Sequence, residues 1–212
     1  METSSVLNLT ELLTGLPNQL RYIKRFSNCR AVIKETVSEH SFYVTMIALF
    51  IAEHLQLQPE EERMLLRRCL LHDIDELFTG DVIHQVKHYS ENIKRDINKM
   101  AVSNMETLFR YILPEYWANI LHTWESAKDD TIVGRIVTFS DYASAVAYVY
   151  EEVVGGNIFM LRNVNALLKD IDKFTKSSDY TFIAPLTEQL EDIVTELRIK
   201  KEKMEWKPKS LS

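Results

Sequence analysis

Apolar residues recur every three to four positions along most of this chain, which is the spacing of amphipathic helices. Val44, Ala48 and Ile51 show this spacing within one segment. The 212 residues include only five glycines and five prolines. That is too few for a turn-rich all-β fold. The sequence therefore predicts an all-α protein, long enough to bury a substantial core.

Capping residues place the boundaries of the expected helices. Thr36 and Glu39 are spaced as in a capping box, which predicts a helix from there to about His54. Pro59 suits the first turn of the next helix, and Gly80 suits its end. The expected helices cover residues 9–24, 36–54, 59–80, 90–112, 114–124, 132–153, 158–174 and 185–206.

No internal repeat or low-complexity linker divides this pattern. We therefore expect a single helical bundle over residues 1–212, with a basic C-terminal tail from about residue 198. Phe42 and Phe50 recur at helical spacing and are expected in its core.

Composition and charge narrow the class of protein. Hydrophobic residues make up 46% and charged residues 26%, as in ordinary soluble domains. No apolar run reaches the ~18 residues of a membrane span, and the N-terminus lacks the pattern of a signal peptide. Cys29 and Cys69 are too few for a disulfide framework. We expect a cytoplasmic protein with reduced thiols and no membrane partner.

The net charge of −6 bears on the partner. A nucleic-acid polymer usually requires a basic surface. A small anionic substrate needs only a local basic patch. The charge therefore favours a small molecule over a polymer.

Four residues in apolar helical segments can coordinate a metal ion: His40, His72, Asp73 and Asp141. A carboxylate in such a segment is costly to bury unless it is paired or metal-bound. A separate partner for each group would remove that cost, but one divalent cation with mixed nitrogen and oxygen ligands satisfies all four. The ligands come from separate segments, so the site would form only in the folded protein.

Glu76 follows His72 by four residues and Asp73 by three. On one continuous helix, this spacing places Glu76 one turn along the same face. A carboxylate beside a bound cation can orient or deprotonate a water that the metal has acidified. The alternative is a surface glutamate paired with a lysine or arginine.

The order of these residues resembles the H…HD…D signature of the HD-domain metal-dependent phosphohydrolases. The surrounding sequence is similar to the bacterial YfbR-like 5′-deoxynucleotidase branch, and the likeness runs from about residue 21 to residue 157. It rests on Arg25-Phe26, Arg30, Glu35-x-Val37-Ser38-Glu39-His40-Ser41, His72-Asp73-x-x-Glu76-x-x-Thr79-Gly80-Asp81 and Val86-Lys87.

The resemblance implies a single HD domain that hydrolyses a phosphate ester, with one divalent ion such as Co²⁺, Mn²⁺ or Mg²⁺ and with Glu76 as the proton-handling carboxylate. Arg25 and Lys87 lie where the family has basic residues, and both are expected to bind the phosphate. Arg30 is a weaker candidate, because a loop salt bridge would also explain it.

The resemblance also bears on the sugar and on assembly. Phe26 and Asp81 are expected to face the sugar of the nucleotide. A homodimer is implied, and the apolar segments 158–168 and 183–197 offer surface for its interface.

The segment after Gly80 departs from the family pattern, which typically reads Asp-Leu-Pro-Thr-Pro-Val-Lys. This chain has no proline between Asp81 and Lys87, and His84 replaces the threonine. A loop without prolines is less rigid, and His84 adds a candidate phosphate contact. His84 and His88 have the spacing of a metal-binding pair on a helix, but no third ligand is evident.

The resemblance favours 2′-deoxynucleoside 5′-monophosphates as substrates. The altered loop leaves nucleoside di- or triphosphates as an alternative, including analogue nucleotides of the oxetanocin type in antibiotic biosynthesis. An HD module that senses a nucleotide without turnover is the alternative of another class. The retained Glu76 favours the enzyme, because a sensor has no need of it.

Overall fold

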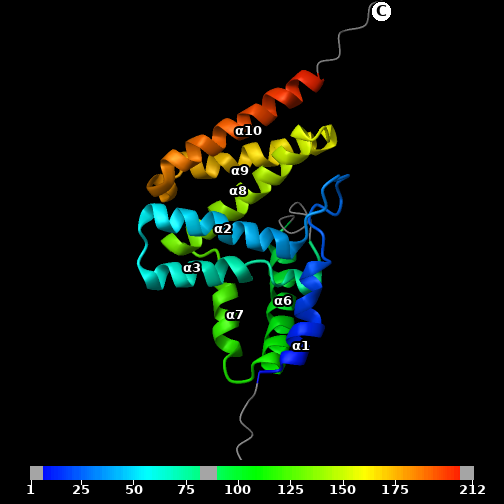
Figure 1. Cartoon of the computed structure of the whole chain (residues 1–212), viewed down its shortest axis with the longest axis vertical. Coiled ribbons are helices and arrows are strands. Elements are labelled where there is room, and N and C mark those ends of the chain that lie inside the picture. The colour runs from blue at the N-terminus through cyan, green and yellow to red at the C-terminus, as the bar shows by residue number, and fades with distance from the viewer. Residues whose placement is uncertain (1–6, 82–89, 206–212) are drawn as a thin grey trace, which may run out of the picture. The chain divides into compact units, whose positions relative to one another are not determined.

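The computed structural model describes residues 7–81 and 90–205, and every regular element in these ranges is helical (Figure 1). Lys24 and Thr36 form an isolated antiparallel bridge. The all-α prediction is thus confirmed. None of the described helices is both long enough and apolar enough to cross a membrane.

The chain divides into two compact units. The first contains the described residues up to Asn28 together with Lys34–Val137, and the second contains Cys29–Ile33 together with the described residues from Thr138 onward. The prediction of one domain over the whole chain stays a prediction.

The first unit is built on two pairs of helices, α2 with α3 and α6 with α7, which pack side by side (Figure 1). Ile74, Leu77, Met105, Phe109 and Trp124 are buried together in a core made by α4 with the turn before it, α6 and α7. The elements are α1 (Leu9–Thr14), the 3₁₀ helix η1 (Leu16–Arg21), α2 (Val37–Leu55), α3 (Pro59–Leu71), α4 (Glu76–Thr79), α6 (Glu91–Ile112), α7 (Trp117–Glu125) and the start of α8 (Ile132–Val154).

The second unit consists of the segment Cys29–Ile33, the remainder of α8 and the helices that follow it. α9 and α10 lie side by side (Figure 1). The Phe174 ring is 5.5 Å from Phe139, 4.9 Å from Tyr142 and 4.8 Å from Tyr180, centroid to centroid. The helices after α8 are η2 (Ile158–Asn163), α9 (Val164–Lys176), η3 (Ser178–Ile183) and α10 (Ala184–Glu205).

Two predicted helix starts are confirmed by their hydrogen bonds. Thr36 accepts a hydrogen bond from the Glu39 N–H, and the Glu39 carboxylate accepts one from the Thr36 N–H, which completes the capping box. The Ser90 hydroxyl accepts from the Ile93 N–H at the start of α6. Both caps satisfy backbone donors that have no partner inside the helix.

Several predicted helices are divided or shortened. The helix expected over residues 9–24 is α1 followed by η1, because the chain turns at Gly15 and Pro17 enters the first turn of a new helix. The helix expected over residues 158–174 begins as the 3₁₀ helix η2, and a further 3₁₀ helix, η3, precedes α10. α7 starts at Trp117 instead of residue 114. Boundary residues are decided by local hydrogen bonds that periodicity does not reveal.

The prediction of a continuous helix from residue 59 to residue 80 is wrong. α3 ends at Leu71, and α4 begins only at Glu76. The N–H groups of Ile74 and Glu76 donate to the carbonyl groups of Leu71 and Asp73, each three residues earlier, at 3.1 Å. The tight turn is of 3₁₀ type, so Glu76 follows Asp73 by one short turn and does not share a regular α-helix with it.

The placement of Phe42 and Phe50 in the core is also wrong. Their side chains are 66% and 69% exposed on α2. The buried face of α2 instead contains His40, Val44 and Ala48. Helical spacing identifies a face, but it does not say whether that face lies inside.

Candidate metal centre

His40 and His72 come from the two paired helices of the first unit. His40 lies in the first turns of α2, where the capping box fixes the start of the helix, and it is fully buried. His72 follows the last residue of α3 and is 5% exposed. Because α2 and α3 pack side by side, the two rings meet in an edge-on arrangement, with centroids 5.3 Å apart.

The ring nitrogens of these histidines converge with the Asp73 carboxylate. His72 Nε2 is 3.3 Å from His40 Nε2 and 3.1 Å from Asp73 Oδ2, and His40 Nε2 is 3.5 Å from the same oxygen. His72 Nδ1 lies 2.7 Å from the Cys69 carbonyl oxygen, which can only accept. A neutral His72 therefore donates from Nδ1 and turns a lone pair toward Asp73.

This arrangement fits a divalent cation. The His72 lone pair and the Asp73 oxygen are both acceptors, and they face each other at close range. A cation between them would convert repulsion into coordination, and the Cys69 carbonyl would hold the imidazole in the tautomer that a metal ligand needs. A buried set of imidazole and carboxylate groups is the donor set of Zn²⁺, Mn²⁺, Fe²⁺ and Co²⁺ sites.

Asp141 belongs to the same group of candidate ligands. One ligand atom from each of His40, His72, Asp73 and Asp141 lies within 4.8 Å of the others. Asp141 is on α8, one helical turn after Val137, which is the last residue of the first unit. The structure thus brings together the four residues that the sequence predicts as ligands.

Glu76 lies beside this cluster as a partly buried acid. The pKa of Glu76 is raised to about 9, chiefly by burial and also by the nearby carboxylates of Asp73 and Asp81, while Arg25 opposes them. Its Oε2 is buried, and no hydrogen-bond partner for it lies within the described residues. A carboxyl group held this way is ready to exchange a proton with a water or a ligand beside it.

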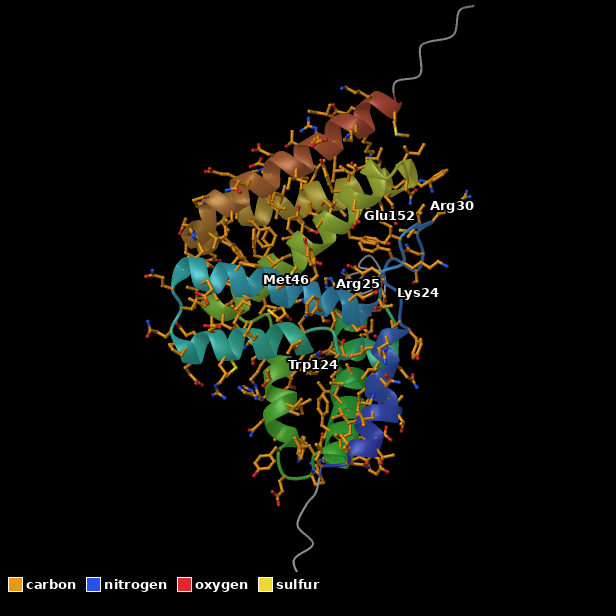
Figure 2. All side chains as sticks on the ribbon, in the orientation of Figure 1. Lys24, Arg25, Arg30, Met46, Trp124 and Glu152 are labelled. Atoms are coloured by element: carbon orange, nitrogen blue, oxygen red, sulfur yellow. The ribbon has the colours of Figure 1, made fainter. Side chains whose placement is uncertain are left out.

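Arg25 lies against His40 on the side away from the other ligands. Its Nη1 is 2.6 Å from His40 Nδ1 and 3.0 Å from a carboxylate oxygen of Glu35. Figure 2 shows Arg25 next to the start of α2. Arg25, the predicted phosphate-binding cation, is therefore next to the candidate metal ligands. Glu35 holds Arg25 there, a role that was not predicted from the sequence.

Phe26 has an unusual backbone conformation, with φ of 51° in the left-handed region. A non-glycine residue there is strained and needs support from its surroundings. The Asp81 carboxylate gives that support by accepting the Phe26 N–H at 2.6 Å. The Phe26 ring lies 5.4 Å from the Arg25 guanidinium carbon. The two residues predicted to face the sugar are thus in direct contact with each other.

Lys128 is a cation at this site that sequence reasoning missed. Its ammonium group is 3.8 Å from Asp73 Oδ1 and is partly exposed. The loop that carries it is fixed by Arg68, which donates to both carboxylate oxygens of Asp129, at 2.8 and 3.0 Å. A lysine between a serine-alanine pair and two aspartates gives no signal in the sequence, because only the fold brings it to Asp73.

Of the remaining predicted residues, only Arg30 lies within the described part of the chain. Arg30 belongs to the second unit, where its guanidinium carbon is 5.6 Å from the Phe159 ring centroid. No salt bridge of Arg30 occurs within the part of the chain that the structure describes. The predicted residues His84, Lys87 and His88 lie outside the described residues, so their roles stay predictions.

A sequence profile of the family described as 5′-deoxynucleotidase YfbR-like matches residues 13–190. The chain belongs to the YfbR-like 5′-deoxynucleotidase family. Membership confirms the predicted resemblance and the predicted class of enzyme, a phosphohydrolase that removes phosphate from nucleotides.

Relatives of the family share about a quarter of their residues with this chain. A 5′-deoxynucleotidase of Vibrio parahaemolyticus is 28% identical over 148 residues, which cover 66% of this chain and 73% of that protein. A 5′-deoxynucleotidase of Cronobacter sakazakii is 29% identical over 147 residues, or 66% of this chain and 72% of that protein.

Solved structures show the same fold. An HD-domain phosphohydrolase from Listeria innocua has a TM-score of 0.70 at 23% identity and covers 91% of this chain and 99% of its own. The HD phosphohydrolase DatZ of cyanophage S-2L, bound to dA and one catalytic Zn²⁺ ion, has a TM-score of 0.54 at 16% identity, over 90% and 96% of the two chains. At these identities the likeness concerns the fold.

Proposed function

We propose that this family member hydrolyses 2′-deoxynucleoside 5′-monophosphates with one divalent ion held by His40, His72, Asp73 and Asp141. The observation that carries the proposal is the convergence of two imidazoles and two carboxylates within 4.8 Å. Relatives named 5′-deoxynucleotidases and a neighbour that binds dA with a Zn²⁺ ion support this substrate class and this kind of cofactor.

The metal would supply Lewis acidity at the phosphate and would lower the pKa of a bound water. The chain prepares the site for it through the tautomers of its histidines. A His40 that accepts from Arg25 at Nδ1 carries its proton on Nε2. If His40 held the metal through Nε2, its proton would have to be on Nδ1, and the Arg25 guanidinium would then be available to the phosphate instead of donating to His40.

Glu76 is proposed as the proton-handling group. Its buried Oε2 lies in a site where burial raises the pKa, so the carboxyl group takes up a proton readily. Such a group can supply a proton to the departing sugar oxygen, and in its ionised form it can remove one from the attacking water. This assignment separates proton transfer from metal binding.

Cationic side chains are proposed to balance the charge of the phosphoryl group. Arg25 and Lys128 approach the cluster from different elements, through His40 and Asp73 respectively. The Phe26 ring and the Asp81 carboxylate are proposed to face the sugar. Lys87 and His84 stay candidate phosphate contacts on the strength of the sequence alone.

The test is a screen of deoxy- and ribonucleoside mono-, di- and triphosphates with Mg²⁺, Mn²⁺, Co²⁺ and Zn²⁺. We expect the highest kcat/KM for a 2′-deoxynucleoside 5′-monophosphate, with inorganic phosphate and the nucleoside as products. Faster turnover of triphosphates would favour the alternative that the altered loop around His84 suggests. Binding of nucleotides without phosphate release with any of the four metals would favour a sensor.

We also propose that the protein is a cytoplasmic homodimer. Several apolar residues of segments 158–168 and 183–197 are buried, among them Leu161, Leu190 and Val194. The exposed Phe42 and Phe50 on α2, with Met46 between them, offer a better surface for a second copy. Figure 2 labels Met46 on this helix.

Light scattering tests the assembly. A dimer is expected at micromolar concentration, and Phe50→Lys is expected to convert it to a monomer. Tyr111→Lys changes an aromatic residue of α6 that is 63% exposed and should leave the dimer intact. A monomeric parent protein would reject the proposal.

A further inference from the structure

Between two stretches of the first unit, the five residues Cys29–Ile33 belong to the second unit. They form the tip of a loop whose two ends are joined in the first unit. The Arg25 N–H donates to the Glu35 carbonyl at 3.0 Å, and Lys24 pairs with Thr36. The loop therefore has a closed neck beside His40 and a tip held elsewhere.

Glu152 holds that tip. It lies in the last turns of α8, its side chain is 1% exposed, and Figure 2 shows it with Arg30 at the same end of the second unit. Its carboxylate accepts the N–H of Val32 at 3.0 Å and also accepts the N–H of Ile33. A buried charge with two main-chain donors can exist only if the loop stays in place.

Two neighbours of Glu152 complete the hold on the loop. Asn157 donates to the Glu152 carboxylate and to the carbonyl of Arg30, the latter at 2.7 Å. The Tyr148 hydroxyl donates to the Ile33 carbonyl at 2.5 Å. Gly156 has φ of 95°, a conformation that favours glycine, and this turn returns Asn157 to α8. Three side chains thus bind the main chain of the loop.

The pKa of Glu152 agrees with this set of hydrogen bonds. Burial alone raises the pKa of Glu152, but the hydrogen bonds from Val32, Asn157 and Ile33 outweigh it, and the pKa lies below its ordinary value. The carboxylate is therefore ionised at neutral pH. Its role does not depend on proton transfer.

A single residue connects the tip of the loop to its neck. Lys34 alone separates Ile33 from Glu35. Because a residue spans at most ~3.6 Å, a displacement of Ile33 is passed on to Glu35. Glu35 in turn binds Arg25 through its carbonyl and through its carboxylate, both at 3.0 Å. Phe26 follows directly in its strained conformation.

We propose that Glu152, through its hold on Val32 and Ile33, is a positioning residue for Arg25 and Phe26. The inference rests on the proposed function for the roles of those two residues at the substrate. It assigns to the second unit a part in substrate binding that involves no contact of Glu152 with substrate or metal.

Glu152→Gln tests the inference, because glutamine keeps the size but cannot accept two main-chain N–H groups with the same carboxylate geometry. KM for a 2′-deoxynucleoside 5′-monophosphate should rise roughly tenfold or more, the scale expected when a positioning group is displaced, while metal content stays at the parent level. Glu151→Gln, the same change at the exposed neighbouring position, is the matched control and should leave KM unchanged.

A double-mutant cycle separates positioning from general damage. If Glu152 acts through Arg25, then Glu152→Gln should have little further effect on KM in an Arg25→Ala protein. Additive effects of the two substitutions would overturn the proposal. Should Glu152→Gln fail to fold, Tyr148→Phe removes one hydroxyl bond to the same loop, and a smaller KM increase that also vanishes in Arg25→Ala is expected.

Amide hydrogen exchange gives a readout that needs no activity. In Glu152→Gln, exchange should accelerate at Val32 and Ile33 and also at Arg25 and Phe26, while Glu151→Gln changes none of them. Acceleration at Val32 and Ile33 alone would overturn the proposal even in an active enzyme. Absence of nucleotide hydrolysis in the parent protein would instead reject the proposed function, and the exchange result would still decide whether Glu152 positions the neck.

Discussion

Glu76 of the first unit and Glu152 of the second are both carboxyl groups with buried oxygens, yet their surroundings are opposite. Burial and neighbouring carboxylates raise the pKa of Glu76 to about 9, and its Oε2 has no hydrogen-bond partner within the described residues. Glu152 receives hydrogen bonds from Val32, Ile33 and Asn157, and its pKa is lowered.

The difference separates a group prepared for chemistry from a group used for structure. A buried acceptor left unsatisfied costs free energy, and such a cost is found where a ligand or a proton is expected. A buried acceptor that is fully satisfied rigidifies what it binds. The fold thus uses one residue type for two purposes and distinguishes them only by the donors it supplies.

The largest expected effect comes from removing a candidate ligand beside Glu76. Asp73→Ala should lower metal content from about one ion per chain to near zero, with loss of essentially all turnover, because the cation loses a ligand from a buried set. Elemental analysis of the purified protein measures it. Asp96→Ala, at an exposed aspartate of α6, should keep the metal. Full metal content in Asp73→Ala and in His72→Ala would refute the assignment of the site.

Glu76→Gln should lower turnover by roughly 10²-fold or more, the usual scale for a general acid–base group, while metal content and substrate KM stay near the parent values. Single-turnover kinetics and elemental analysis provide the measurements. Glu53→Gln, at an exposed position of α2, is the control. A rate within a few-fold of the parent would show that Glu76 does not handle the proton and would remove the contrast with Glu152.

Lys128→Ala should reduce kcat/KM by about tenfold, because a partly exposed cation loses part of its effect to solvent screening. Lys128→Arg should recover much of the loss by keeping the charge. Steady-state kinetics with a fixed metal measures both. Lys176→Ala, which removes a charge that is 71% exposed in the second unit, should have no effect. Equal losses in Lys128→Arg and Lys128→Ala would show that charge is not what Lys128 supplies.

The smallest effect concerns the stability of the region around Glu152. Its folded pKa lies below the ordinary 4.5, so the unfolded chain binds this proton more readily. The stabilisation is therefore complete above about pH 4.5 and is lost as the pH falls through the lower folded value. Glu152→Gln should cost about 1–3 kcal/mol at neutral pH and should show a shallower loss of stability in acid. Thermal unfolding at pH 3 to 7 measures both quantities, with Glu151→Gln as control, and equal acid slopes would contradict the satisfied-carboxylate description.

The all-α class, the capped starts of α2 and α6 and the four candidate ligands could all be predicted from the amino-acid sequence. Each of these depends on local spacing or on residue chemistry: Thr36 with Glu39, Ser90, and His or Asp in apolar segments. Such signals survive without knowledge of the fold, because a cap or a costly buried charge is recognisable from its neighbours in the chain.

The remaining features of the fold and of the site depend on how the helices pack. In the folded chain, the expected helix is interrupted between Leu71 and Glu76, and Phe42 and Phe50 are exposed. Lys128 lies beside Asp73. Glu152 accepts a hydrogen bond from a loop that lies more than a hundred residues away in the sequence. These features depend on which surfaces face each other after packing, and side-chain periodicity contains no information about a partner from a distant segment.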